Sequence, residues 1–392
     1  MARNYDAVVV GGGIMGLSIA WSLARRAAGR IALLEKAYLG AGGSGKSGAI
    51  IRQHYSNRLT AQLARDSLRI FQEFDQVVQG PPVFTRTGLA IVVHQNDLPA
   101  LQANLQMQQE LGIDVHLVSA RELAELDPNT RLAEDEVAAW ESEAGYVDAI
   151  QALTSYAQAC QREGVEIQEG VEVRQLLRQG NRAVGLETNE GRLNCGIVAL
   201  AVGPWINRLA DSLRVDIPVQ ASRTQVALFR RPVEMGRRTA TCVDFVGQIY
   251  YRATAGELLH VGSIAGEEVR DRVDPDDYSE VADRDWVPAI RQRLQQRCPA
   301  MHRCYGRGGY AALYDITPDW HPILDRCPQM ENVYLAVGFS GHGFKFAPMI
   351  GQLLAEWIVD GQYRSLDVSA FRLNRFAEGQ LIKTRYTYGV IA

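Results

Sequence analysis

The chain has 392 residues, of which 47% are hydrophobic and 22% are charged. At roughly 150 residues per domain, this length predicts two domains or one large core with an inserted unit, and the composition excludes disorder, collagen and a coiled coil. The formal net charge is −4, so there is no basic excess to hold a nucleic-acid backbone and we expect no nucleic-acid partner.

The first predicted unit is a strand, a helix and a second strand. An apolar run at residues 6–10 leads into GGGIMG, apolar residues then recur at helical spacing, and the strand at 31–35 ends in a carboxylate. Glycines at this turn let a pyrophosphate approach the helix N-terminus, and the acid can accept hydrogen bonds from a ribose. We therefore expect dinucleotide contacts at Gly11, Gly13, Ile14, Met15, Gly16, Glu35 and Lys36.

A second glycine-rich stretch, GAGGSGKS at residues 40–47, fits the Walker A pattern. A P-loop must join a strand directly to a helix, whereas this stretch follows the second strand by several residues and continues into an isoleucine-rich segment. We interpret it as a loop that approaches a flat cofactor ring. Its expected contacts are Ser44, Lys46, Ser47 and Gly48.

The middle of the chain mixes helices and strands. Asn57 is a predicted N-cap, and the run CGIVALAV, from 195 to 202, has the continuous apolar character of a strand buried on both faces. The other predicted elements are strands at 84–93, 114–118, 165–167 and 171–173, helices at 97–111 and 150–163, an antiparallel segment at 217–264 and a charged helix at 278–296.

The end of the chain returns to the pattern of its beginning. A strand at 333–337 precedes GFSGHG, and a helix follows at 347–359. Nucleotide-type elements therefore enclose antiparallel ones, and we predict an α/β fold in which a Rossmann-like domain is interleaved with an antiparallel-sheet α+β domain. The predicted nucleotide-binding domain comprises 1–83, 145–215 and 310–392, and the second domain comprises 84–144 and 216–309.

The six cysteines are scattered and form no CxxC pair. This cysteine usage predicts a reduced, cytoplasmic protein. The sequence shows neither a signal-peptide pattern nor an apolar run long enough to span a membrane, and we therefore expect no transmembrane segment. Cys298, His302 and Cys304 lie close together, but structural zinc takes four ligands from paired spacings, so we expect no metal there.

Four segments carry a family resemblance: VVVGGGIMG with Glu35, the loop GSGKSGAIIRQHYS, the run ALAVGPW, and GFSGHGFKFAP. Together they resemble the FAD-dependent amine and amino-acid oxidoreductases of the D-amino-acid oxidase superfamily, nearest to glycine oxidase and to sarcosine oxidase in its monomeric and β-subunit forms. The resemblance implies an FAD-binding domain and a substrate domain. A disulfide reductase is excluded because no cysteine precedes residue 160.

The resemblance also implies roles for individual residues. Arg52 and Lys345 would hold a substrate carboxylate, Tyr251 would line the substrate pocket, and His260 or His342 could hydrogen-bond substrate or water. Further cofactor contacts are implied at Val173, Ala201, Gly203, Trp205, Gly338, Phe339, Gly341, His342, Gly343 and Lys345.

Two departures from the family pattern matter. Ala312 stands where the monomeric sarcosine oxidases carry a cysteine that holds the flavin, so we expect non-covalent FAD, with His54 as the residue to examine for another covalent link. His260 falls at the position of the family's oxygen-activating lysine. Slow reaction with O₂ is then expected, and an acceptor protein or a quinone becomes the alternative acceptor.

The expected reaction is oxidation of the C–N bond of a small amino acid or N-methyl amino acid such as sarcosine, glycine or proline. A hydride equivalent passes to the flavin, and the imine is then hydrolysed. A flavin-dependent 2-hydroxy-acid dehydrogenase and a non-catalytic flavin-binding assembly protein stay open as alternatives. The chain could also be one subunit of a larger dehydrogenase.

Overall fold

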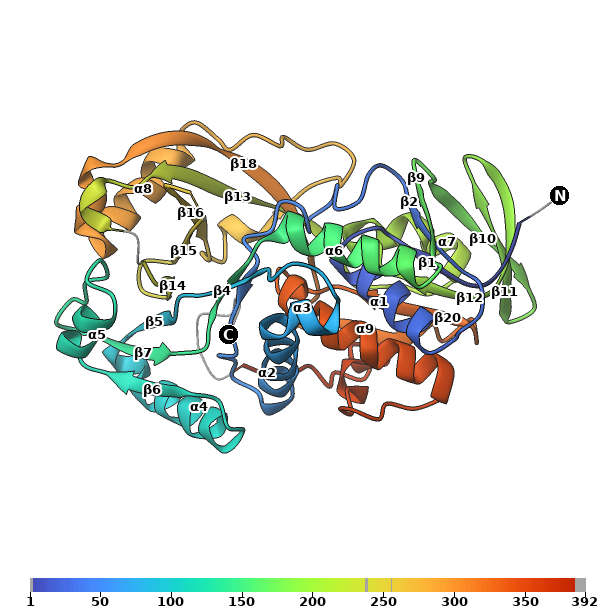
Figure 1. Cartoon of the computed structure of the whole chain (residues 1–392), viewed down its shortest axis with the longest axis horizontal. Helices are drawn as coiled ribbons and strands as arrows, with labels where there is room; N and C mark the ends of the chain where they lie inside the picture. The colour runs from blue at the N-terminus through green and yellow to red at the C-terminus, as the bar shows by residue number, and fades with distance from the viewer. Residues whose placement is uncertain (1–2, 237–238, 255, 385–392) are drawn as a thin grey trace.

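The computed structural model of the chain describes residues 3–236, 239–254 and 256–384. Two large mixed sheets lie towards opposite ends of the long axis, and helices pack between and beside them (Figure 1). This arrangement confirms the α/β class predicted from the sequence. The helices are α1 (Ile14–Arg25), α2 (Arg58–Gln72), α3 (Phe74–Val77), α4 (Leu98–Glu110), α5 (Ala120–Leu126), α6 (Ala149–Arg162), α7 (Ala210–Leu213), α8 (Trp286–Arg297) and α9 (Gly343–Asp360).

The eight-stranded sheet has a parallel centre in the order β20-β12-β1-β2-β9. Helices α1, α6 and α9 contribute to the core on one face of this sheet. Residues 7–10 of β1 and 198–200 of β12 are buried, as expected where both faces of a parallel sheet are covered. The strands are β1 (Arg3–Val10), β2 (Ile31–Glu35), β9 (Glu166–Glu169), β10 (Val173–Gln179), β11 (Arg182–Thr188), β12 (Gly191–Leu200), β19 (Ile323–Arg326) and β20 (Val333–Val337).

The nine-stranded sheet is mainly antiparallel and carries the longest strands, β13 and β18, side by side. Alternate side chains along these strands point to opposite faces, so one face forms a wall towards the other sheet and the opposite face joins a separate core. The strands are β5 (Leu89–His94), β6 (Val115–Val118), β7 (Glu136–Glu141), β13 (Gln220–Arg230), β14 (Thr241–Asp244), β15 (Ile249–Ala253), β16 (Leu258–Ser263), β17 (Asp271–Arg272) and β18 (Tyr305–Ile316).

Three short strands form a small third sheet. It joins β3 (Ile50–Ile51), β8 (Gly145–Val147) and β4 (Phe84–Arg86), with β8 in the centre. The two large sheets draw on the segments that the sequence analysis assigned to two domains, although β18 crosses the predicted boundary at residue 310. The division into domains stays a prediction.

Several predicted elements agree with the structure and others need correction. Asn57 caps α2 by accepting a hydrogen bond from the Thr60 N–H (2.8 Å), as predicted. The strand predicted at 84–93 is interrupted, because Gly88 has a φ of +71° between β4 and β5. The helix predicted at 278–296 is wrong in its first half: α8 begins at Trp286, and the acidic residues before it form ion pairs with the other sheet's loops instead.

Candidate active site

The first strand, helix and second strand meet at a tight turn below an open groove. A Cβ added to Gly16 would lie 1.8 Å from the Gly11 carbonyl oxygen, so only glycine lets α1 approach β1 this closely. The N-terminus of α1 has no acidic residue in its first turn. The Ile14 N–H donates to Ser44 Oγ (3.0 Å), and the partial positive charge of this helix end favours an anion in the groove.

Glu35 lies at the end of β2 and lines this groove. Its carboxylate accepts hydrogen bonds from the Gly12 N–H (2.7 Å) and the Ala37 N–H (2.9 Å). These two bonds fix the side chain at the groove edge while the remaining lone pairs can accept hydrogen bonds from a ligand.

The groove has a volume of about 690 Å³ and is lined by the ends of β1, β2 and β10, by neighbouring loops and by residues 275–280. It continues into a second cavity of about 190 Å³, and the two share lining residues, among them Gly13, Ser44 and Gly203. Three of the four lysines in the chain, Lys36, Lys46 and Lys345, line one or the other. Lys36 and Lys46 pair with acidic residues of the same cleft, Asp276 and Glu280, so Lys345 is the lysine of the three without an ion pair among the described residues.

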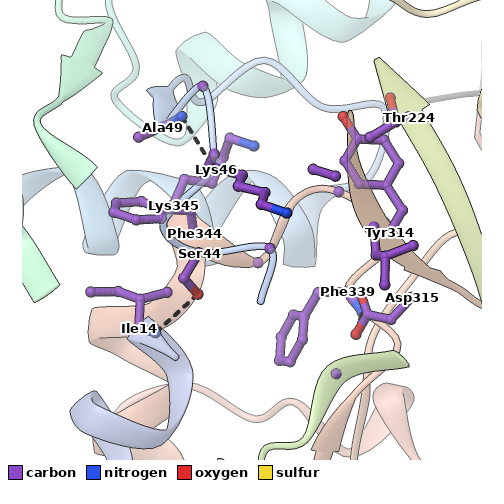
Figure 2. A pocket seen from close by; sticks show the side chains of 18 of the residues that line it. Ile14, Ser44, Lys46, Ala49, Thr224, Tyr314, Asp315, Phe339, Phe344 and Lys345 are labelled. Carbon is purple, nitrogen blue, oxygen red and sulfur yellow. Dashed lines mark hydrogen bonds between the residues drawn. The ribbon is translucent and has the colours of Figure 1, made fainter. Parts of the chain in front are cut away.

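The second cavity lies between two different walls. Figure 2 shows Ile14, Ser44, Lys46, Ala49 and Lys345 on one side and Thr224, Tyr314, Asp315 and Phe339 on the other. The first side comes from the glycine-rich loop and the beginning of α9, and the second from β13, β18 and the loop before α9.

Two buried cations line the second cavity. Arg52 is 4% exposed and Lys345 is 6% exposed. The Arg52 guanidinium lies 4.2 Å from the centre of the Tyr55 ring and donates a hydrogen bond to the His54 carbonyl oxygen. The Lys345 amine has no hydrogen-bond partner among the described residues and lies 6.0 Å from the same ring. Burial, with Arg52 as a second cause, holds the pKa of Lys345 well below its usual value.

Two histidines pack behind these cations. His54 Nδ1 hydrogen-bonds Gln108 Oε1 (3.1 Å), and burial, together with Arg52, lowers the pKa of His54 to about 3. His342 Nδ1 hydrogen-bonds the Tyr55 hydroxyl (3.0 Å), and burial and Lys345 lower its pKa well below the usual value. Neither histidine is among the residues that line the two cavities, whereas Gly341 and Gly343 on either side of His342 are, so the contacts of His342 with cofactor and substrate stay predictions.

The tyrosine expected in the substrate pocket is also displaced by one position. Tyr251 is fully buried in the core behind the nine-stranded sheet, where its hydroxyl contacts Thr130 (2.5 Å) and accepts from the Cys298 thiol (3.2 Å). Tyr250 points to the opposite face and lines the cavity. Gly262, paired with Tyr250 across the strands, leaves room for its ring, because a Cβ there would lie 2.3 Å from it.

His260 likewise does not line the cavity. It lies on β16 beside Tyr310, and burial, with Arg252 as a second cause, lowers its pKa to about 4. Ile264, just beyond the end of β16, lines the cavity instead. The contact of His260 with substrate therefore stays a prediction that its position outside the cavity lining does not support.

Most of the implied cofactor residues gather along the cleft. Gly16 and Gly338 do not line it: Gly16 packs the turn, and the Gly338 N–H donates to Asp315 Oδ2 (2.7 Å). Those that line it are Gly11, Gly13, Ile14, Met15, Glu35, Lys36, Ser44, Lys46, Ser47, Gly48, Val173, Ala201, Gly203, Trp205, Phe339, Gly341, Gly343 and Lys345.

Sequence reasoning missed a segment that closes the groove, residues 274–280, which we name the strap. Lys36 pairs with Asp276 (2.6 Å), and Lys46 pairs with Glu280 (2.7 Å). The Trp205 indole N–H also donates to Asp276 (2.7 Å). The acidic run DPDDYSE is a signal for such pairing, but the sequence analysis assigned its last three residues to the charged helix predicted at 278–296.

No group of three or more side chains suited to a metal ion occurs in the described ranges. Cys298 and Cys304 are buried free thiols. Helices of the described chain are too short or too polar to cross a bilayer.

The chain is similar to known proteins over almost its whole length. Residues 6–357 match the family described as DAO, FAD dependent oxidoreductase. The chain belongs to this family. It is 29% identical over 95% of its length to peroxisomal sarcosine oxidase of Homo sapiens, of which it covers 96%. It is 24% identical over 99% of its length to sarcosine oxidase subunit beta of Rhodobacter capsulatus, of which it covers 92%.

A solved structure agrees with these relatives. L-proline dehydrogenase from P. horikoshii matches with a TM-score of 0.89 at 25% identity, over 97% of this chain and 100% of that one. The resemblance inferred from the motifs, the Rossmann-like FAD-binding fold and the use of FAD are thereby confirmed.

The cleft of this FAD-dependent oxidoreductase fits the cofactor. Gly11 and Gly13 form a cradle that larger residues would fill, since added Cβ atoms would meet Ala201 oxygen at 2.4 Å and Ser44 Oγ at 2.9 Å. The groove would hold the adenosine and pyrophosphate against Glu35 and α1, and the second cavity would hold the flavin ring. Ala312 lines that second cavity, and no cysteine within the described ranges lines either part.

Proposed function

We propose that this enzyme oxidises the C–N bond of a small amino acid or N-methyl amino acid of the sarcosine, glycine or proline kind. The observation that carries the proposal is the pair of buried cations, Arg52 and Lys345, at the cavity next to the cofactor groove. An arginine and a lysine that face the same cavity suit a substrate carboxylate. The names of relatives, sarcosine oxidase and L-proline dehydrogenase, support this substrate class.

The two cations would orient the substrate. Arg52 is held by its own backbone turn and by the Tyr55 ring, so its guanidinium is preorganised for a carboxylate. The Lys345 amine makes no hydrogen bond to a described residue, so its N–H donors are available to the substrate carboxylate. With the carboxylate fixed at this wall, the carbon next to the nitrogen would be directed into the cavity. The carbon could then approach the cofactor in one geometry.

The site also favours one protonation state of the substrate. An ammonium group close to the buried Arg52 guanidinium is repelled, so the amine would bind neutral with its lone pair available. Bound FAD supplies a two-electron acceptor for the hydride equivalent from the carbon next to the nitrogen. The imine product is then hydrolysed by water to a carbonyl compound and an amine. No proton transfer by His54, His260 or His342 is needed in this scheme.

The apolar lining of the cavity would restrict the shape of the substrate. Val226, Val243, Tyr250 and Ile264 line the cavity with apolar and aromatic surface. A small aliphatic amino acid can bury its carbon atoms here while its carboxylate meets the cations.

An anaerobic titration tests the proposal. The purified holoenzyme is mixed with N-methyl amino acids, D- and L-amino acids and 2-hydroxy acids while flavin absorbance is followed. We expect bleaching by an amino acid, and a loss of at least about 100-fold in kcat/KM for Arg52→Met and Lys345→Met. Lys383→Met, an exposed lysine that lines neither cavity, is the matched control.

Other outcomes assign the other functions. Bleaching by 2-hydroxy acids alone would make the enzyme a flavin-dependent 2-hydroxy-acid dehydrogenase. No bleaching by any compound, with flavin fully bound, would favour a non-catalytic flavin-binding assembly protein.

The electron acceptor is the second part of the proposal. Ile264 lines the cavity at the end of β16, and no lysine of that strand does. We propose slow reaction with O₂ and transfer to an acceptor protein or a quinone, with partner subunits possible as in the β-subunit relative. Admitting air after bleaching tests this, because rapid recolouring would identify an oxidase.

A further inference from the structure

Glu141 is a buried carboxylate that the proposed reaction does not use. It ends β7 in the nine-stranded sheet and is 0% exposed. Its Oε1 accepts hydrogen bonds from the Gln53 N–H (2.7 Å) and the Gln53 side-chain amide (3.1 Å), and its Oε2 accepts from the His54 N–H (3.0 Å). A carboxylate that accepts three N–H donors in the protein interior is tightly fixed.

These bonds tie Glu141 to Arg52. Gln53 and His54 follow Arg52 directly, and the His54 carbonyl oxygen in turn accepts a hydrogen bond from the Arg52 guanidinium. Gln108 on α4 supports the same segment, because its amide donates to the Tyr55 carbonyl oxygen (2.9 Å). The turn that directs Arg52 into the cavity is therefore held from the nine-stranded sheet and α4, across more than 50 residues of chain.

The charges around Glu141 can be counted. His54, Tyr55 and His342 are neutral near pH 8, because burial lowers the pKa of both histidines and raises that of the tyrosine. The titratable and charged groups that remain on this wall are the Arg52 guanidinium, the Lys345 amine and the Glu141 carboxylate. Lys46 is paired with Glu280, and Asp315 lies on the opposite wall (Figure 2).

We propose that Glu141 is a positioning residue of the carboxylate site: it holds the segment that carries Arg52, and its charge balances part of that of Arg52 and Lys345. This inference rests on the proposed function, because it takes the two cations to be the binding site of a substrate carboxylate.

A second consequence concerns the protonation of Lys345. Burial and Arg52 lower the pKa of Lys345, whereas Glu141 raises it. Burial raises the pKa of Glu141 itself to about 7, so above pH 8 it is the anion that supports the lysine. Without this charge, Lys345 loses its proton at a lower pH. The affinity of the site for a carboxylate then begins to decrease at a lower pH than in the wild-type enzyme.

Acetate binding tests both effects. The holoenzyme is titrated with acetate, and with acetamide as a neutral control, between pH 7.5 and 10 while the flavin spectrum is followed. For Glu141→Gln at pH 8 we expect a Kd for acetate raised about tenfold and an unchanged Kd for acetamide. The pH above which acetate affinity falls should be lower by about one unit, and Lys345→Met should abolish this dependence.

Two further variants separate positioning from folding. Glu136→Gln removes another buried carboxylate of β7, one that pairs with Arg297 (2.6 Å) away from the cavity, and should leave acetate binding unchanged. Glu141→Asp keeps the charge but shortens its reach, and should raise the Kd about threefold with the pH dependence retained. This variant also serves if Glu141→Gln does not fold with FAD bound.

The outcomes separate failure of the proposed carboxylate site from failure of the role of Glu141. If the wild-type enzyme does not bind acetate, the proposed carboxylate site fails and the inference with it. If acetate binds and is lost in Arg52→Met, but Glu141→Gln binds it with wild-type affinity and pH dependence, only the inference is wrong. It is also wrong if Glu136→Gln weakens acetate binding as much as Glu141→Gln does.

Discussion

Tyr250 and Tyr251 are adjacent on β15 and belong to different parts of the molecule. One lines the cavity and the other packs in the core, because successive side chains on a strand point to opposite faces. A sequence match that is wrong by one position therefore exchanges a ligand contact for a core residue.

Removing each hydroxyl should separate these roles. Tyr251→Phe loses a buried hydrogen bond and should lower the free energy of unfolding by about 1 kcal/mol, with KM unchanged. Tyr250→Phe should change KM with little loss of stability. Denaturant unfolding and steady-state kinetics measure both. A changed KM in Tyr251→Phe alone would place Tyr251, and not Tyr250, at the substrate.

At the scale of elements, the conformation of the strap depends on partners far away in the sequence. Residues 274–280 lie between β17, a strand of the nine-stranded sheet, and the helix α8. Pro275, Asp276 and Tyr278 nevertheless line the groove together with Glu35, which belongs to the eight-stranded sheet. The strap is held by partly exposed ion pairs, which salt screens. Its hold on the cofactor should therefore depend on ionic strength.

FAD release measures this dependence. Raising the salt from about 0.1 to 1 M should speed release about three- to tenfold, since exposed ion pairs contribute up to about 1 kcal/mol each. Asp276→Asn should release FAD faster at low salt and respond less to added salt. Glu257→Gln, which breaks an exposed pair with Arg230 (2.7 Å) elsewhere, is the control. Equal salt dependence in Asp276→Asn and wild type would contradict the role of the strap.

At the scale of the whole molecule, the cleft joins the two large sheets. Its lining includes Gly11 and Glu35 from one sheet and Thr224 and Tyr250 from the other. A cofactor seated there contacts both, so its binding energy adds to the stability of the assembled chain.

Calorimetry of the apo and holo forms tests this coupling. With FAD at about 1000 times its Kd, the free energy of unfolding should rise by about 4 kcal/mol, in a single transition. Two transitions, of which only one shifts with FAD, would show that the cofactor contacts one domain alone.

Some features follow from the sequence because they depend on neighbouring residues. The glycine turn before α1, Glu35 at the end of β2 and the Asn57 cap are each defined within a few residues, so their structures are as predicted. Local sterics and local hydrogen bonds decide these conformations wherever the segment lies.

The tertiary structure decided the rest. The face on which Tyr250 and Tyr251 lie follows from the register of β15 against β16, and the conformation of the strap follows from partners such as Lys36, about 240 residues away in the chain. The role of Glu141 depends in the same way on Gln53 and His54. The sequence by itself determined the family, the cofactor and the pair of cations, whereas long-range packing and burial decided which side chains face them, because those energies depend on residues that meet only in the folded chain.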